Sequence, residues 1–274
     1  MKFCYALLGL AASFGTISAR AQPPVAAPPD SSRLSAAALP SGPAAPFRPL
    51  RLLTSPAALR VGVPLTLIGV SYFGREQRLI REARLEIQEE AREQFPTFNT
   101  TLDDYTRRVP VVAAYALQLA GVKPARGLVP FTLIYLAAHH LNAGATSNLK
   151  RLCRAPRPDN PADFSSFPSG HTSEAFMTAT LLHEQFGKTS PWISVGGYAM
   201  AAATGTMRVL HNKHWVTDVV AGAGVGFLSA EVAWRAYPYA ARLLPTRLAH
   251  KLLLLPTYAP GGAVGLVLAV RPGR

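Results

Sequence analysis

Three short blocks in the second half of the sequence hold the residues best suited to chemistry. They are Lys150 and Arg157 in the first block, Ser169, Gly170 and His171 in the second, and Arg208, His214 and Asp218 in the third. The lysine and the two arginines provide positive charge and N–H donors that suit a tetrahedral oxyanion better than a planar or neutral group. The blocks therefore predict a pocket for a phosphate-like oxyanion, with two histidines and one carboxylate left for covalent and proton chemistry.

The third block predicts an oriented nucleophile. His214 and Asp218 are four residues apart, so on a helix they would share a face. The carboxylate could then accept a hydrogen bond from one ring nitrogen while the other nitrogen points outward.

The second block precedes a predicted helix. Residues 172–174, Thr-Ser-Glu, are typical of a helix start, where free backbone N–H groups and the positive end of the dipole receive anions. We expect this helix to run from 172 to about 187, followed by a turn over 188–191 and a second helix to about 207. Such a hairpin would return Arg208 to the level of His171.

With these blocks in place, residues 148–237 resemble the type 2 phosphatidic acid phosphatase superfamily, which includes bacterial class A acid phosphatases and vanadium haloperoxidases. The polar residues of all three blocks fall at the family's spacing and in its order. One departure is Met207, which stands where the family usually has serine. The resemblance implies an all-α helical bundle of the phosphatase and haloperoxidase kind.

The resemblance also implies a role for each residue of the blocks. His214 would attack phosphorus and form a phosphohistidine, Asp218 would hold its tautomer, and His171 would protonate the leaving oxygen. The phosphate oxygens would be bound by Lys150, Arg157, Ser169, Gly170 and Arg208. No metal or other cofactor is expected.

The rest of the chain divides by composition. Residues 1–21 have the pattern of a secretory signal peptide, and residues 22–55 form a linker rich in Pro and Ala. Residues 56–108 form an N-terminal segment whose amphipathic helix, at about 75–95, would lie either on a membrane surface or on the domain itself. The catalytic domain is expected at 109–240, and the tail at 241–274 has possible strand character.

Several uncharged stretches favour a membrane-embedded or membrane-associated bundle over a soluble one. Residues 127–149 and 189–207 approach the roughly 20 residues that a span requires, and small residues in them suit close helix packing. Residues 105–274 carry seventeen Lys and Arg against six Asp and Glu, which favours an anionic substrate or lipid surface. We expect an exported protein of the bacterial envelope with its site facing the periplasm.

The predicted function is a metal-independent phosphatase acting on an envelope lipid that carries a phosphate or diphosphate. Candidate substrates are phosphatidic acid, phosphatidylglycerol phosphate, polyprenyl diphosphate and lipid A. The alternatives are a soluble periplasmic acid phosphatase of broad specificity, a vanadate-dependent haloperoxidase and a non-catalytic lipid binder. The position of Arg157 before the second block argues against a nucleic-acid partner, and the sequence leaves the oligomeric state open.

Histidines outside the three blocks are expected to be structural. These are His139, His140 and His183. His211 and Lys213 lie within the third block, where they would form a solvated turn or contact a head group.

Overall fold

A computed structural model describes residues 56–243, 252–258 and 264–270. The chain divides into two compact units after Ser55, and the described residues all belong to the second unit. The signal peptide and linker predicted for residues 1–55 therefore lie outside the described residues.

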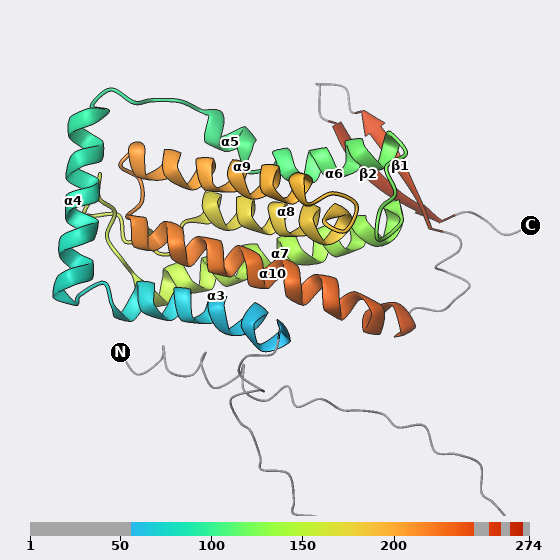
Figure 1. The fold of residues 1–274 in the computed structure, drawn as a ribbon, viewed down its shortest axis with the longest axis horizontal. Helices are drawn as coiled ribbons and strands as arrows, with labels where there is room; N and C mark the ends of the chain where they lie inside the picture. Colours follow the sequence, from blue (N-terminus) through green and yellow to red (C-terminus); the bar gives the residue numbers. More distant parts are fainter. Residues whose placement is uncertain (1–55, 244–251, 259–263, 271–274) are drawn as a thin grey trace, which may run out of the picture. The chain divides into compact units, whose positions relative to one another are not determined.

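The described unit is an all-helical bundle followed by a β-hairpin, so the predicted fold class is confirmed (Figure 1). Its helices are α3 (Pro56–Phe73), α4 (Arg78–Gln94), α5 (Leu102–Thr106), α6 (Val109–Leu119), α7 (Leu128–Cys153), α8 (Gly170–Phe186), α9 (Pro191–Leu210) and α10 (Val216–Leu243). Strands β1 (Leu252–Tyr258) and β2 (Val264–Val270) pair antiparallel, with Leu252 opposite Val270. The strand character expected of the tail is thus present in its described parts.

Helix α8 lies at the centre of the bundle. It packs against α6, α7, α9 and α10, and most of its residues are buried. Met177, Leu181 and Phe186 of α8 join a core that includes Phe131 and Ile134 of α7. The predicted hairpin of two helices is confirmed as α8 and α9, and α8 begins two residues earlier than expected.

Two glycines of α10 let this helix approach α8 closely. A Cβ at Gly222 would lie 2.6 Å from the Ser169 carbonyl oxygen. A Cβ at Gly226 would overlap the Ser173 carbonyl oxygen and lie 2.8 Å from the Met177 nitrogen. Because these contacts are with backbone atoms, side-chain rotation cannot relieve them. The close approach places the start of α8 beside the start of α10, and with it the second block beside the third.

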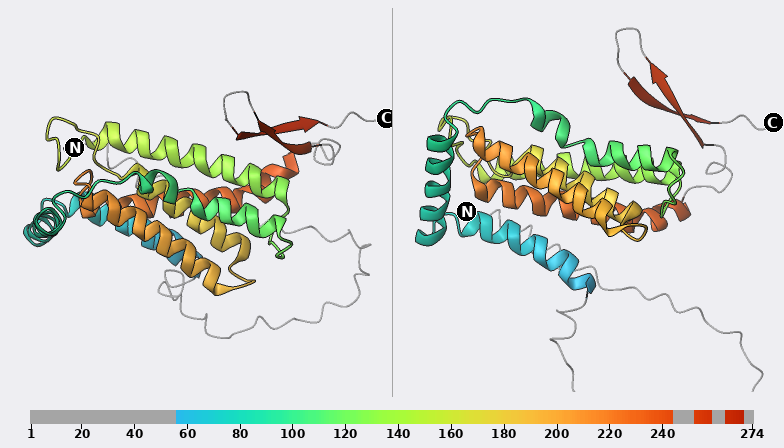
Figure 2. Two further views of the ribbon diagram at one scale, coloured as in Figure 1. Left: turned by 90° about the horizontal axis from the view of Figure 1, so that it is seen from above. Right: turned by 45° about the horizontal axis from the view of Figure 1, so that its top comes forward.

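Helix α4 crosses the end of the bundle at which α9 turns into α10 (Figures 1 and 2). It is the predicted amphipathic helix, but its apolar stripe does not face the bundle: Ala91 is buried, whereas Leu79 is 79% exposed. The buried Gln88 donates instead to the Val209 carbonyl oxygen (3.2 Å) and to Asn212 Oδ1 (2.6 Å). The helix contacts a polar turn, which explains why a polar residue is buried there.

The two longest uncharged stretches form most of α7 and α9, but neither helix combines the length and the hydropathy that crossing a membrane requires. Among the described residues, one helix is long and apolar enough to cross a membrane, residues Val216–Arg242 of α10. Of its most apolar window, 61% is buried inside the bundle. Polar residues within α7, such as His139, His140 and Asn142, lower the hydropathy of that helix.

Candidate active site

The first block is held by the loop that precedes α8. The Lys150 ammonium donates to the carbonyl oxygens of Ser165 and Ser166, the latter at 3.4 Å. Arg157 donates from Nε and Nη2 to Ser165 Oγ, at 3.2 and 3.1 Å, and its Nε lies 3.0 Å from Asp163 Oδ2. Burial, with a further contribution from the Arg157 charge, lowers the pKa of Lys150 to about 8. Both cations of this block are thus anchored to Ser165.

Asp218 links the third block to the second block and to the loop before it. Its Oδ2 accepts hydrogen bonds from Ser166 Oγ (2.5 Å) and from the Trp215 backbone N–H (3.1 Å). Its backbone carbonyl accepts the N–H of Ser169 (3.0 Å). Asp218 lies in the first turn of α10, and its carboxylate accepts the backbone N–H of the residue just before that helix. This hydrogen bond satisfies one of the backbone donors that a helix start leaves without a partner.

His214 does not share a helix face with Asp218, so that part of the prediction is wrong. Helix α10 begins at Val216, and His214 lies before it, after a turn in which Asn212 has a φ of 56°. The two side chains still meet because the carboxylate folds back, leaving 3.8 Å between His214 Nδ1 and Asp218 Oδ2. Within the described part of the chain, this buried nitrogen has no hydrogen-bond partner.

The surroundings of His214 favour its neutral form. Burial lowers the pKa of its imidazole to about 4, and the positive charges of Lys150 and Arg208 act in the same direction. Asp218 opposes them but does not reverse the shift. At neutral pH the ring therefore keeps an unprotonated nitrogen, as a nucleophile requires.

The second block forms the N-terminus of α8. Ser169 is the N-cap and is fully buried, and its Oγ accepts a hydrogen bond from Thr172 Oγ1 (2.9 Å). Gly170 is the first helical residue, and no described atom lies within 4 Å of where its Cβ would be. The start of this helix therefore has free backbone donors beside open space, an arrangement that suits an anion.

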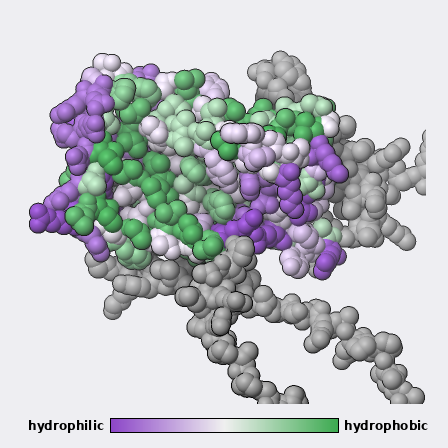
Figure 3. Space-filling view, in the orientation of Figure 1, coloured by the Kyte–Doolittle hydropathy of each residue, from purple (hydrophilic) through white to green (hydrophobic). Residues whose placement is uncertain are grey.

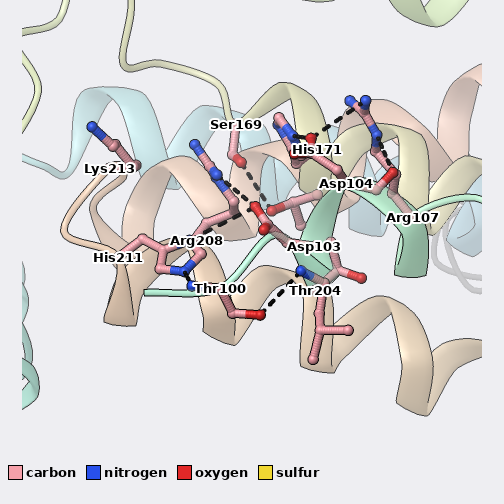
Figure 4. Close-up of polar contacts among 12 residues, drawn as sticks. Thr100, Asp103, Asp104, Arg107, Ser169, His171, Thr204, Arg208, His211 and Lys213 are labelled. Atoms are coloured by element: carbon pink, nitrogen blue, oxygen red, sulfur yellow. Dashed lines mark hydrogen bonds and ion pairs between the residues drawn. The ribbon is translucent and has the colours of Figure 1, made fainter. Parts of the chain in front are cut away.

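Two aspartates of α5 contact the second and third blocks (Figure 4). Arg208 Nη1 lies 2.5 Å from Asp103 Oδ2, and His171 Nε2 lies 2.8 Å from Asp104 Oδ1. Burial lowers the pKa of His171, whereas its hydrogen bond to Asp104 raises it. Sequence reasoning missed both aspartates, because no spacing connects them with the blocks; the one available signal was two adjacent acids in a region rich in cations.

A family model matches the part of the chain that holds this site. Residues 131–242 match the model of the PAP2 superfamily. The part of the chain that holds the predicted site therefore carries the sequence pattern of the PAP2 superfamily. The matched range contains all eight predicted site residues, whereas α5 lies outside it.

A curated relative of this chain is the lipid A 1-phosphatase of Porphyromonas gingivalis. The two are 40% identical over 144 residues, which cover 50% of this chain and 31% of the relative. The chain thus matches less than a third of the relative's length.

Two solved structures are also similar to this chain. One is the transmembrane PAP2-type phosphatidylglycerolphosphate phosphatase from Bacillus subtilis, with 18% identity, a TM-score of 0.46, and coverage of 69% of this chain and 98% of that one. The other is Aquifex aeolicus LpxE, with 22% identity, a TM-score of 0.38, and coverage of 54% and 93%.

The remaining polar residues near the candidate site have structural contacts. His211 Nε2 accepts the backbone N–H of Thr100 (3.2 Å), and its ring lies 5.0 Å from that of Phe98. It is a packed residue, not part of the expected solvated turn. Lys213 is more exposed and pairs with Asp159 at 2.6 Å. Across residues 56–243 and the two strands, no group of three or more His, Cys, Asp or Glu side chains is arranged to hold a metal ion.

Proposed function

We propose that this protein is a phosphatase that acts on a phosphorylated lipid through a phosphohistidine at His214. The observation that carries the proposal is the environment of His214. Its ring is buried and neutral, the cations Lys150 and Arg208 act on it, and Asp218 lies behind its Nδ1. A neutral nucleophile surrounded by fixed cations suits attack on an anionic phosphate.

In the first step, His214 Nε2 attacks phosphorus in line with the leaving oxygen. The N–P bond forms as the P–O bond breaks, and His171 gives its proton to the departing oxygen. The ring of His214 becomes positively charged, and the carboxylate of Asp218 stabilises that charge.

The second step returns the enzyme to its starting state. His171, now unprotonated, takes a proton from water as the water oxygen attacks phosphorus and the N–P bond breaks. Inorganic phosphate leaves and His214 is neutral again. In both steps the cationic side chains and the start of α8 bind the equatorial oxygens, so positive charge at the phosphate comes from Lys150, Arg157 and Arg208 without a metal ion.

A lipid is the substrate class best supported by the surface and the comparisons. Figure 3 shows an apolar area on the bundle between hydrophilic residues at the α4 end and at the opposite end. Helix α3 also exposes large apolar side chains, including Val63, Leu67 and Val70. Because a relative at 40% identity is named a lipid A 1-phosphatase, lipid A is placed first, ahead of phosphatidic acid, phosphatidylglycerol phosphate and polyprenyl diphosphate.

The same surface supports a membrane arrangement. We infer that the bundle lies in a bacterial envelope membrane with its apolar area in lipid and the α4 end at the periplasmic face. All three blocks lie at that end, where the phosphate head group of a lipid would be found. The amphipathic α4, with Leu79 and Phe95 exposed, would then lie in the interface.

Phosphate release by the detergent-solubilised full chain, with EDTA present, tests this function. The substrates are lipid A, the three other candidate lipids and a soluble aryl phosphate. We expect release from one lipid, loss of at least about 10³-fold in His214→Ala, and little change in His140→Ala, which removes an exposed histidine outside the site.

Other outcomes separate the alternatives. Release confined to the aryl phosphate would favour a soluble phosphatase of broad specificity. Halide oxidation that requires added vanadate would favour a haloperoxidase. Lipid binding without any phosphate release would favour a non-catalytic binder, and each of these results would overturn the proposal.

A further inference from the structure

The carboxylate of Asp104 in α5 contacts His171, the residue proposed to transfer the proton. Helix α5 lies outside the region that the family model matches. Asp104 Oδ1 lies 2.8 Å from His171 Nε2, a hydrogen-bond distance (Figure 4). Among the described residues, no hydrogen bond is made by His171 Nδ1. The contact therefore holds one ring nitrogen and leaves the other for substrate.

Contacts on both sides of Asp104 fix α5 against α9. Before it, Asp103 pairs with Arg208 at 2.5 Å, and both side chains are largely buried. After it, Thr106 Oγ1 lies 2.8 Å from Thr204 Oγ1. A carboxylate held in this way can define a ring orientation, which a residue on a loosely packed loop could not do.

The next anchor is Arg107, at the end of α5. Its Nη1 lies 3.2 Å from Glu174 Oε2, and its carbonyl oxygen accepts the hydroxyl of Thr178 (2.8 Å). Its Nη2 lies 3.6 Å from Asp104 Oδ1. The same arginine thus ties α5 to α8 and positions the carboxylate that contacts His171.

The charged groups around His171 come from α5, from Arg107 just after it, and from α9. Burial lowers the pKa of the ring, and Arg208 and Arg107 lower it further. Asp104 and, more weakly, Asp103 raise it. Asp104 is therefore the main group that keeps His171 able to hold a proton at the pH where a leaving oxygen needs one. Its side chain is 52% exposed, so solvent screens part of this effect.

We propose that Asp104 is a positioning residue that orients His171 and sustains its protonated form for transfer to the leaving-group oxygen. This inference rests on the proposed function. It predicts two separate effects of losing the carboxylate: a weaker proton donor, and a ring free to turn away from the substrate.

The test compares pH profiles of kcat/KM for Asp104→Asn and the wild type on one lipid phosphate. In the wild type, activity should fall as pH rises and His171 loses its proton. Since the carboxylate raises the pKa of His171, its removal should move this fall to lower pH by about 0.5–1 unit. Using one substrate for both proteins cancels the ionisation of the substrate phosphate.

Leaving-group dependence provides a second readout. Asp104→Asn should lower kcat about tenfold or more on the lipid phosphate and much less on an activated aryl phosphate, whose departure needs little protonation. Asp104→Glu, which keeps a carboxylate, should restore part of both effects. Asp159→Asn is the matched control, because it removes a carboxylate that pairs with Lys213 away from His171.

The two proposals fail in different ways. Absence of phosphate release from the wild type on every substrate would overturn the proposed function. Release that depends on His214, together with an Asp104→Asn profile that matches the wild type, would overturn this inference alone. Equal losses on lipid and aryl substrates with an unshifted profile would show a merely structural role for Asp104 and would likewise overturn it.

Discussion

Replacing Gly226 with alanine tests the close packing of α8 on α10 that places the second and third blocks side by side. A Cβ at this position would overlap the Ser173 carbonyl oxygen and lie 2.8 Å from the Met177 nitrogen. Both are backbone atoms of α8, so the helices must move apart to accept the methyl group.

The magnitude follows from two opposing effects. Alanine gains about 1 kcal/mol over glycine in a helix interior, whereas overpacking costs about 1–3 kcal/mol or more. With rigid backbone as the obstacle, the high end of the cost applies, and we expect a net loss of about 2 kcal/mol in the free energy of unfolding. For a unit of this size that corresponds to a fall in Tm of about 4–8 °C.

The matched control is Gly69→Ala in α3, where no described atom of the neighbouring elements lies within 4 Å of the added Cβ. This variant should keep or slightly raise Tm, because the helix gain is unopposed. Thermal unfolding of both variants in one detergent, followed by phosphate release at a temperature where both are folded, provides the comparison. Gly226→Ala should also lose about tenfold or more in activity, since Ser169 moves relative to Asp218. Equal Tm values for the two variants would refute the packing account.

Three further predictions concern the chemistry. Asp218→Asn should lower kcat about 10²-fold or more while Tm changes little, measured by phosphate release and thermal unfolding; full activity would contradict a role for the carboxylate. His171→Ala should slow lipid phosphates far more than activated aryl phosphates, and equal losses would exclude proton donation. The folded pKa of His214, about 4, lies below the ordinary 6.5, so stability should fall by about 3 kcal/mol as pH drops from 6.5 to 4. Denaturant unfolding of the wild type and His214→Gln checks this, and a variant with the same pH dependence would contradict it.

The sequence predicted the hairpin of α8 and α9 because its signals are local. Helix formers, a turn at 188–191 and an uncharged run determine where each helix lies. The short spacing of His214 and Asp218 indicated that their side chains would lie close together, and His214 Nδ1 lies 3.8 Å from Asp218 Oδ2.

What the sequence could not predict depends on long-range contacts. Asp104 meets His171 across 67 residues, and Ser166 meets Asp218 across 52; no periodicity or spacing connects either pair. The helical relation expected between His214 and Asp218 was wrong for a similar reason. The start of α10 is set by the turn at Asn212 and by contacts with α4, which a four-residue spacing does not reveal.

Detection of phosphate on His214 during turnover would test the proposed phosphohistidine directly. In His171→Ala, an activated aryl phosphate can still transfer its phosphate, but the base that activates water is missing, so the intermediate should accumulate. Mass spectrometry of the rapidly quenched variant should find a phosphate on His214 that is stable in base and lost in acid. The double variant that also carries His214→Ala should show no phosphate. Release of the aryl alcohol without any phosphorylated enzyme, or phosphate on another residue, would contradict the account.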